Sequence, residues 1–181
     1  MIHMHVGQCG CQLGDEFWVQ MQKGFRNTGV FSQSKLQRAS SGGARSTEST
    51  AMQLLPPAVF VDSEPKVVHH LRSTPRASNV VFEQSGRGNN WAFGYEGSER
   101  LCELTMDSVR QELERQRTAA HGFNIVHGLS GGTGSGLGSR IVARLREEYP
   151  KLCVRPCVRV LAHCCCGVWL AMRQSRKSTR D

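Results

Sequence analysis

The sequence contains no apolar run long enough to cross a bilayer. The longest candidate near its end, Val160 to Met172, falls short of the roughly 20 residues that a membrane-spanning helix needs, and it contains His163. The first residues lack the basic region and apolar core that mark a secretory signal peptide. We therefore expect no membrane span and a cytoplasmic location, where cysteine thiols stay reduced.

Acidic residues are outnumbered: 15 Asp and Glu stand against 23 Lys and Arg, which gives a formal net charge of +8. Such a charge would ordinarily suggest nucleic acid or an anionic membrane as a partner. However, residues 151–181 hold seven Lys and Arg and one Asp, so +6 of the +8 belongs to that segment. The rest of the chain is nearly neutral, and we expect no nucleic-acid partner for it.

Short apolar runs alternate with segments of helical periodicity. They predict strands at 2–6, 57–62, 79–82 and 123–126, a helix after Gly7 that ends at Gly24, and helices at 99–116 and 137–148. Residues 32–53, rich in Ser, Arg, Gly, Gln and Thr, predict an exposed flexible loop. Repeated strand, loop and helix is typical of a single α/β domain that binds ligands at the carboxyl ends of parallel strands.

One loop is built almost entirely of small residues. Seven of the eight residues from Ser130 to Leu137 are Gly, Ser or Thr, directly between a predicted strand and a predicted helix. Backbone N–H groups of such a loop converge on an anion at a helix N-terminus, and Thr133 and Ser135 add hydroxyl groups. The sequence has no G-x-x-x-x-G-K-[ST] motif, and the loop has no G-x-G-x-x-G motif. We therefore expect phosphate binding by backbone groups, and branched side chains at Gly132 or Gly134 to occupy the phosphate's space; the alternative is a tight turn without a ligand.

Three other segments reach the same edge of the predicted sheet. Gln8 and Cys9 follow the first strand, and a GRGNN sequence supplies a second glycine turn with two amides. Asp62 and Glu64 follow the second strand as a carboxylate pair suited to Mg²⁺ or its water ligands, because Mg²⁺ prefers hard oxygen ligands. Each segment alone is a weak signal, and an isolated VDSEP is more often a turn than a metal site.

The four segments GQCGCQLG, VDSEP, SGRGNNWAFGY and SGGTGSGLGS resemble, in this order and spacing, the tubulin signatures GQCGNQ, VD-x-EP, G-x-GNNWA and GGGTGSG. The resemblance covers about residues 2–153. It implies a Rossmann-like parallel sheet with flanking helices, a truncated form of the tubulin nucleotide-binding domain. It also implies GTP with Mg²⁺ as ligands, other tubulin subunits or microtubules as partners, and a cytoskeletal location.

The resemblance assigns roles to residues of this chain. The nucleotide would be contacted by Gln8, Cys9, Gln12, Asn89, Gly131, Gly132, Thr133 and Gly134, and Glu64 would belong to the magnesium environment. No catalytic residue is assigned, because tubulins complete GTP hydrolysis with an acidic residue of the next subunit that has no counterpart among these residues. We therefore expect the chain to bind GTP rather than to hydrolyse it.

Within the family, EPKV and NWAFGY are most similar to δ-tubulins, which are linked to centrioles and basal bodies. The γ-tubulins, which nucleate microtubules, are the second choice. Three positions depart from the common pattern: Cys11 replaces Asn, Gly128 replaces a frequent Ser, and Ser130 replaces the first glycine of GGGTGSG. None of these changes removes the backbone groups of the loop.

Residues 154–181 form a basic, cysteine-rich tail that does not follow the family pattern, so the GTP-binding domain is expected at 1–153 in incomplete form. Cys164, Cys165 and Cys166 beside basic residues suggest palmitoylation or, more weakly, zinc binding, but an unselected tail is favoured over both. Two other hypotheses remain open. The basic tail would act as an interaction module, or the product would have no stable fold.

Overall fold

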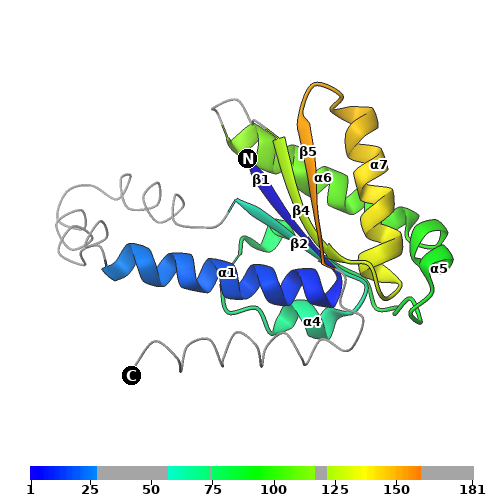
Figure 1. The fold of residues 1–181 in the computed structure, drawn as a ribbon, viewed down its shortest axis with the longest axis horizontal. Coiled ribbons are helices and arrows are strands. Elements are labelled where there is room, and N and C mark those ends of the chain that lie inside the picture. The colour runs from blue at the N-terminus through cyan, green and yellow to red at the C-terminus, as the bar shows by residue number, and fades with distance from the viewer. Residues whose placement is uncertain (28–56, 74, 117–121, 160–181) are drawn as a thin grey trace.

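A computed structural model describes residues 1–27, 57–73, 75–116 and 122–159, which form a parallel sheet with helices on both faces (Figure 1). The predicted loop at 32–53 and the cysteines 164–166 lie outside these residues. The α/β fold with a Rossmann-like parallel sheet and flanking helices is confirmed.

The sheet has five strands in the order β3-β2-β1-β4-β5, and every neighbouring pair is parallel. The strands are β1 (Ile2–Val6), β2 (Ala58–Asp62), β3 (Val80–Phe82), β4 (Gly122–Gly128) and β5 (Cys153–Arg159). β1 lies at the centre, where Met4 pairs with Val59 on one side and Ile125 on the other. The chain therefore turns from one side of β1 to the other between β3 and β4, which leaves a crevice beside the carboxyl end of β1.

Strand periodicity sends alternate side chains to two separate cores. On one face, Ile2, Met4 and Val6 pack with residues of α6 (Glu99–Arg115) and α7 (Gly138–Glu148). On the other, Ala58 and Phe60 pack with residues of α1 (Gly7–Asn27) and α4 (Pro65–His69). β2 is buried on both faces, and its residues before Asp62 are all apolar, as its apolar run predicts.

The predicted long elements are confirmed with small changes in their ends. The periodic face of α7 is buried at Ile141 and Leu145, and Arg144 pairs with Glu148 at 3.2 Å as the spacing predicts. The predicted end of the first helix at Gly24 is wrong, because α1 continues to Asn27. A Cβ at Gly24 would meet no atom within 4 Å, so this glycine faces open space. Its only cost to the helix is the low helix propensity of glycine.

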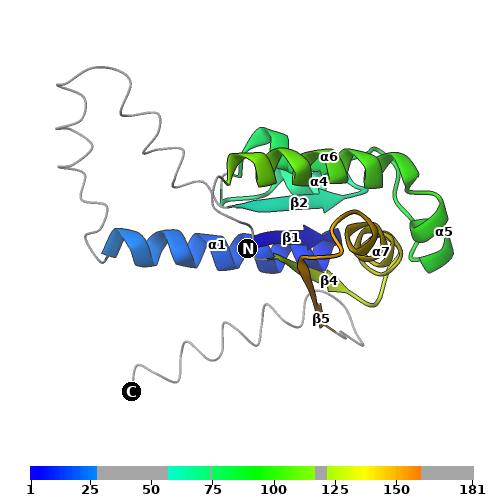
Figure 2. The same cartoon turned by 90° about the horizontal axis from the view of Figure 1, so that it is seen from above.

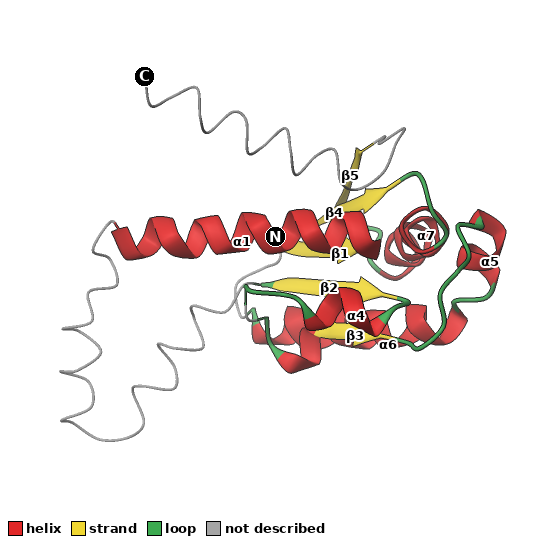
Figure 3. Cartoon of the chain, turned by 90° about the horizontal axis from the view of Figure 1, so that it is seen from below, coloured by secondary structure: helices red, strands yellow, loops and turns green. Residues whose placement is uncertain are grey.

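Five elements were absent from the sequence predictions: α4, the 3₁₀ turn η1 (Ala77–Asn79), and the three that follow. A short helix, α5 (Trp91–Glu96), begins inside the NNWAFGY sequence, where the Asn90 side chain accepts hydrogen bonds from the amides of Ala92 and Phe93. α5 lies beside α7 and far from α1 (Figure 3). A π-type turn, η2 (Thr133–Leu137), leads into α7. β5 extends the sheet at its outer edge, beyond Cys153 where the predicted domain ended (Figure 2).

Candidate nucleotide-binding site

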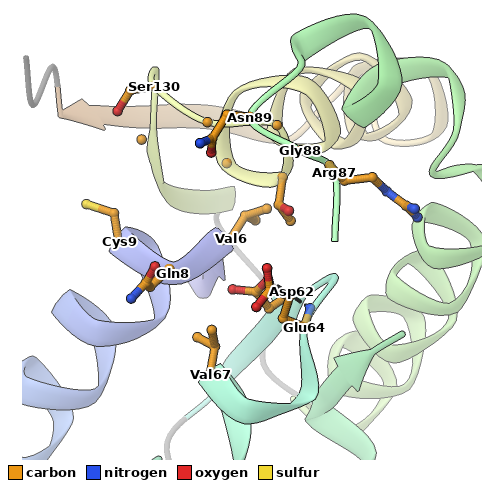
Figure 4. Close-up of a pocket in the computed structure, with 16 residues that line it drawn as sticks. Val6, Gln8, Cys9, Asp62, Glu64, Val67, Arg87, Gly88, Asn89 and Ser130 are labelled. Atoms are coloured by element: carbon orange, nitrogen blue, oxygen red, sulfur yellow. Dashed lines mark hydrogen bonds between the residues drawn. The ribbon is translucent and has the colours of Figure 1, made fainter. Parts of the chain in front are cut away.

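A cavity of about 680 Å³ lies at the carboxyl ends of β1, β2 and β4, in the crevice that the strand order creates. Loops from distant parts of the sequence meet around it (Figure 4). Of the nucleotide-contacting residues that the sequence predicted, those lining the cavity are Gln8, Cys9, Asn89, Gly131, Gly132, Thr133 and Gly134, together with the predicted metal residue Glu64.

Gln12 is the predicted site residue that does not line this cavity. It lines a second cavity of about 210 Å³, with Asp15 and Lys66, beside the first turns of α1 and α4. Gln8 and Val67 line both cavities, so the two lie next to each other. Gln12 therefore lies one helical turn beyond the residues that line the larger space.

Two helices begin at the larger cavity. α1 starts at Gly7, and Gly7, Gln8 and Cys9 line the cavity. Thr133 and Gly134 line it from the start of η2, which continues into α7 without a break. The first amides of a helix have no partner within the helix, and the helix dipole is positive at this end. Both features favour an anion in the cavity.

The glycine loop is held in place by a buried residue whose role the sequence did not indicate. His127, 4% exposed, is the last residue but one of β4, and its Nδ1 atom lies 2.8 Å from the carbonyl oxygen of Gly134 and 3.3 Å from that of Gly128. Because both neighbours are acceptors, Nδ1 carries the proton and donates it. The predicted strand ended at Val126, and a single histidine after a strand has no sequence signal that separates this role from ordinary packing.

The two hydroxyl groups predicted to reach a phosphate are already bonded within the protein. The Thr133 hydroxyl oxygen lies 2.5 Å from that of Ser63, so it links the loop after β2 to η2. Ser135 is 4% exposed and its hydroxyl donates to the carbonyl oxygen of Gly131. The prediction for Ser135 was therefore wrong, because its side chain turns into the loop rather than into the cavity.

Gly132 and Gly134 are small for a reason that the sequence did not show. A Cβ on Gly132 would lie 2.5 Å from the Cβ of Arg87 and 2.7 Å from its carbonyl oxygen. A Cβ on Gly134 would meet the backbone of Gly128, with 3.1 Å to its oxygen. Protein atoms, rather than the phosphate's space alone, therefore exclude side chains there. Gly131, with φ +96°, is different, since a Cβ placed there would meet only the Asn89 side chain, at 3.6 Å.

Two carboxylates lie together across the cavity from this loop (Figure 4). Asp62 is 3% exposed, its Oδ1 atom accepts the Glu64 amide at 3.1 Å, and its Oδ2 atom is buried without a hydrogen-bond partner. Burial raises the pKa of Asp62 to about 6, a rise that hydrogen bonds from the Glu64 and Ser63 amides oppose and the Glu64 charge supports. Glu64 is more exposed and pairs with Lys66 at 3.0 Å.

These oxygen atoms fit a hard divalent cation. A Mg²⁺ ion usually takes one or two protein carboxylates and completes its shell with water and ligand phosphates. The unpartnered Oδ2 atom of Asp62, beside Glu64 in the cavity, is such a donor. Within the described residues, no group of three or more His, Cys, Asp and Glu side chains forms a closed metal site. The arrangement therefore suits a cation shared with a ligand.

Basic side chains take little part in the lining. Arg87 is the cationic residue among those that line the cavity, and its guanidinium points away towards α6 (Figure 4). It pairs with Glu83 instead. An anionic ligand would therefore be held by backbone amides, helix dipoles and a cation, as the missing P-loop lysine led us to expect.

No helix in the described part of the chain is both long and apolar enough to cross a membrane.

Comparison with known proteins found a matching family and several similar chains. The family described as "Tubulin/FtsZ family, GTPase domain" matches residues 1–165, which extends beyond Cys153. The chain is 42% identical over 159 residues to the Tubulin beta-1 chain of Colletotrichum graminicola, covering 83% of this chain and 35% of that protein. It is 39% identical over 175 residues to the Tubulin beta-4B chain of Mesocricetus auratus, covering 90% and 59%. The nucleomorph Tubulin beta chain of Guillardia theta is 40% identical over 159 residues, covering 83% and 36%. The chain thus spans between about a third and three fifths of the length of these relatives.

Proposed function

Since the chain belongs to the tubulin/FtsZ family of GTPase domains, we propose that it binds GTP in the cavity at the carboxyl edge of its sheet. One observation carries this proposal: the start of α1 and the start of η2 line the same cavity, although they lie more than a hundred residues apart. Amides at the start of a helix have no partner within that helix, and such amides from two helix ends suit the phosphates of a nucleotide.

The residues assigned to the nucleotide divide by chemistry. Gly131, Gly132, Thr133 and Gly134 offer backbone amides to the phosphates, and the amides of Gln8 and Cys9 do so from α1. Asn89 offers a carboxamide beside Gly131. Gln12 belongs to the proposal through its place in the adjoining cavity, where an elongated ligand would reach it.

We propose that Mg²⁺ accompanies the nucleotide and that Asp62 and Glu64 hold it, directly or through water. When bound, the cation offsets phosphate charge that no basic side chain of the cavity neutralises. Asp62 is well placed for this because its Oδ2 atom has no other partner.

We further propose that the protein acts with other tubulin subunits or microtubules in the cytoplasm and cytoskeleton. The support is membership of the family and relatives that are named tubulin chains. Within the family we propose a δ-tubulin-like role at centrioles or basal bodies, with a γ-tubulin-like nucleating role as the alternative. The sequences EPKV and NWAFGY support the δ assignment, while the relatives described above carry β-tubulin names.

Localisation tests the subfamily. A fluorescently tagged chain should concentrate at centrioles or basal bodies in ciliated cells. Uniform labelling along cytoplasmic microtubules would overturn the δ assignment and favour a β-like role.

A titration tests nucleotide binding. The full chain should quench or enhance a fluorescent GTP analogue saturably with Mg²⁺ present, and unlabelled GTP should displace it. Glu64→Ala should mainly reduce the magnesium dependence of binding, with little change in affinity when the metal is removed by a chelator. Glu147→Ala is the matched control, because Glu147 is an exposed carboxylate of α7 that pairs with Arg144 outside the cavity. Absence of saturable GTP binding by a protein shown to be folded would refute the proposed function.

A further inference from the structure

The loop between β3 and α6 closes around one side chain. Arg87 is 5% exposed, and its three guanidinium nitrogens donate to three different residues. Nη2 donates to Glu83 Oε2 at 2.5 Å and Nη1 to Ser85 Oγ at 2.8 Å, at the start of the loop. Nε donates to Ser98 Oγ at 2.7 Å, where the loop ends and α6 begins. The guanidinium thus joins both ends of the loop.

A ring covers the guanidinium as well. The guanidinium carbon of Arg87 lies 5.3 Å from the ring centroid of Phe93, which belongs to α5. Stacking of this kind is attractive for a cation and keeps the planar group in one orientation. The two ends of the loop therefore form one packed unit with α5 and the guanidinium.

The backbone at and after Arg87 lines the cavity. Gly88 and Asn89, which follow Arg87, both have φ 53° and both line the cavity. Glycine adopts this region readily, but Asn89 is a non-glycine there, so the surrounding structure must hold its backbone. The Cβ and carbonyl oxygen of Arg87 also pack against Gly132 of the glycine loop.

We propose that Arg87 is a positioning residue for nucleotide binding, which fixes Gly88 and Asn89 over the cavity and backs Gly132 while its own side chain touches no ligand. This inference rests on the proposed function and deepens it. Asn89 is the contact through which Arg87 acts, since its Oδ1 atom lies beside Gly131 and its backbone is the next but one after Arg87.

The geometry requires an arginine rather than any cation. The three acceptors lie around a planar fork that presents its donors in different directions, whereas a lysine ammonium is a single point on a flexible stem. Arg87→Lys should therefore fail to restore what Arg87→Ala loses, even though the charge opposite Glu83 is kept.

Affinity of the full chain for a fluorescent GTP analogue tests the proposal. Arg87→Ala and Arg87→Lys should each weaken binding about tenfold, which corresponds to the loss of one charge-assisted hydrogen bond's worth of positioning. Arg76→Ala is the matched control, because Arg76 also forms a largely buried ion pair, with Glu112 at 3.0 Å, but does not line the cavity. It should lower the melting temperature comparably and change affinity less than about twofold when all variants are measured well below their melting temperatures.

A double-mutant cycle separates positioning from general stability. If Arg87 acts through Asn89, then Arg87→Ala should cost little further affinity once Asn89→Ala is present. Arg76→Ala should instead leave the effect of Asn89→Ala unchanged. Additive losses for Arg87 and Asn89 would overturn the proposed route, because they would show independent effects.

A gentler variant covers the case in which Arg87→Ala does not fold. Ser98→Ala removes one anchor of the guanidinium and should weaken binding a few-fold, while Ser108→Ala, a buried serine of α6 bonded to the Ser78 carbonyl at 2.9 Å, should not. Parent-like affinity in folded Arg87→Ala or Ser98→Ala would overturn the positioning role and leave GTP binding by the parent intact. Failure of the parent itself to bind GTP would instead remove the proposed function.

Discussion

The hydroxyl oxygens of Ser63 and Thr133 lie 2.5 Å apart, which joins the loop after β2 to the start of η2. In the sequence Ser63 stands between the two carboxylates of the cavity, and Thr133 belongs to the glycine loop. The proposed metal side and phosphate side of the site are therefore connected by one hydrogen bond between side chains.

Breaking this bond should loosen both sides together. We expect Ser63→Ala and Thr133→Val each to lower the unfolding free energy by about 1 kcal/mol, and the double variant to lower it by less than their sum. Both should also weaken magnesium-dependent nucleotide binding. Urea unfolding and nucleotide titration measure these effects. Ser139→Ala is the control, since its hydroxyl bonds to the Ser135 carbonyl within the helix at 2.7 Å; fully additive losses would show that the two loops are not coupled.

Gly128→Ser should be tolerated and should increase affinity. A Cβ at Gly128 would lie 3.5 Å from the Ser130 carbonyl oxygen and 3.6 Å from the Cys9 Cβ, which are ordinary contacts. The added hydroxyl would enter the lining of the cavity, where one hydrogen bond is worth about 1 kcal/mol, or several-fold in the dissociation constant. Calorimetry with GTP measures the gain; an unchanged affinity in a variant of unchanged stability would show that no nucleotide oxygen is within reach.

Gly132→Ala should destabilise the protein without any nucleotide. Its Cβ would overlap Arg87 and lie 3.0 Å from the Asn90 carbonyl oxygen, and overpacking of this kind typically costs about 1–3 kcal/mol. Gly24→Ala, on an open part of α1, should instead stabilise by up to about 1 kcal/mol. Thermal unfolding of the nucleotide-free proteins checks both. If Gly132→Ala unfolded like the parent yet lost GTP, the phosphate alone would account for the glycine.

Acid should destabilise the fold through His5. Burial, with a smaller contribution from the charge of His3, lowers the pKa of His5 from 6.5 to about 3. The imidazole of His5 therefore binds a proton more readily in the unfolded chain than in the fold. Its contribution to the unfolding free energy is complete above about pH 6.5 and is lost as the pH falls towards 3, by up to about 1.4 kcal/mol per pH unit.

The variant His5→Gln isolates this contribution. Glutamine does not titrate and keeps an acceptor for the Trp18 indole N–H, which donates to His5 Nε2 at 3.2 Å. Urea unfolding at several pH values, followed by tryptophan fluorescence, should show a shallower loss of stability between pH 7 and 5 than in the parent. Equal slopes would mean that other groups control the acid sensitivity.

Periodicity was sufficient for β1 to β4, but β5 was not predicted. Ile2, Met4 and Val6 alternate because one face of β1 packs on α6 and α7, and that alternation is visible in the sequence. The end of α1 was misjudged because local propensity at Gly24 is weaker than the packing of the rest of the helix. α5 depends on a cap from Asn90, a residue that also fits a loop.

The motifs predicted which residues surround the cavity but not what each one does. Gly132 was expected to make room for phosphate, whereas the structure shows the backbone of Arg87 against it. His127 gave no signal, since its role depends on two carbonyl groups that only the fold brings to its ring. Ser135 and Thr133 both carry a hydroxyl group, and only the geometry shows that Ser135 bonds within its own loop and Thr133 bonds to the loop after β2.

The central position of β1 also sets the order in which the protein can fold. His3 contacts Asn124, 121 residues later, and β1 pairs with both β2 and β4, so the pairing of β1 is completed only when β4 has emerged. At roughly 5–20 residues per second, synthesis alone delays that pairing by several seconds. Throughout this interval the edge of β1 that pairs with β4 lacks its partner strand, which makes completion of the sheet a slow, non-local step.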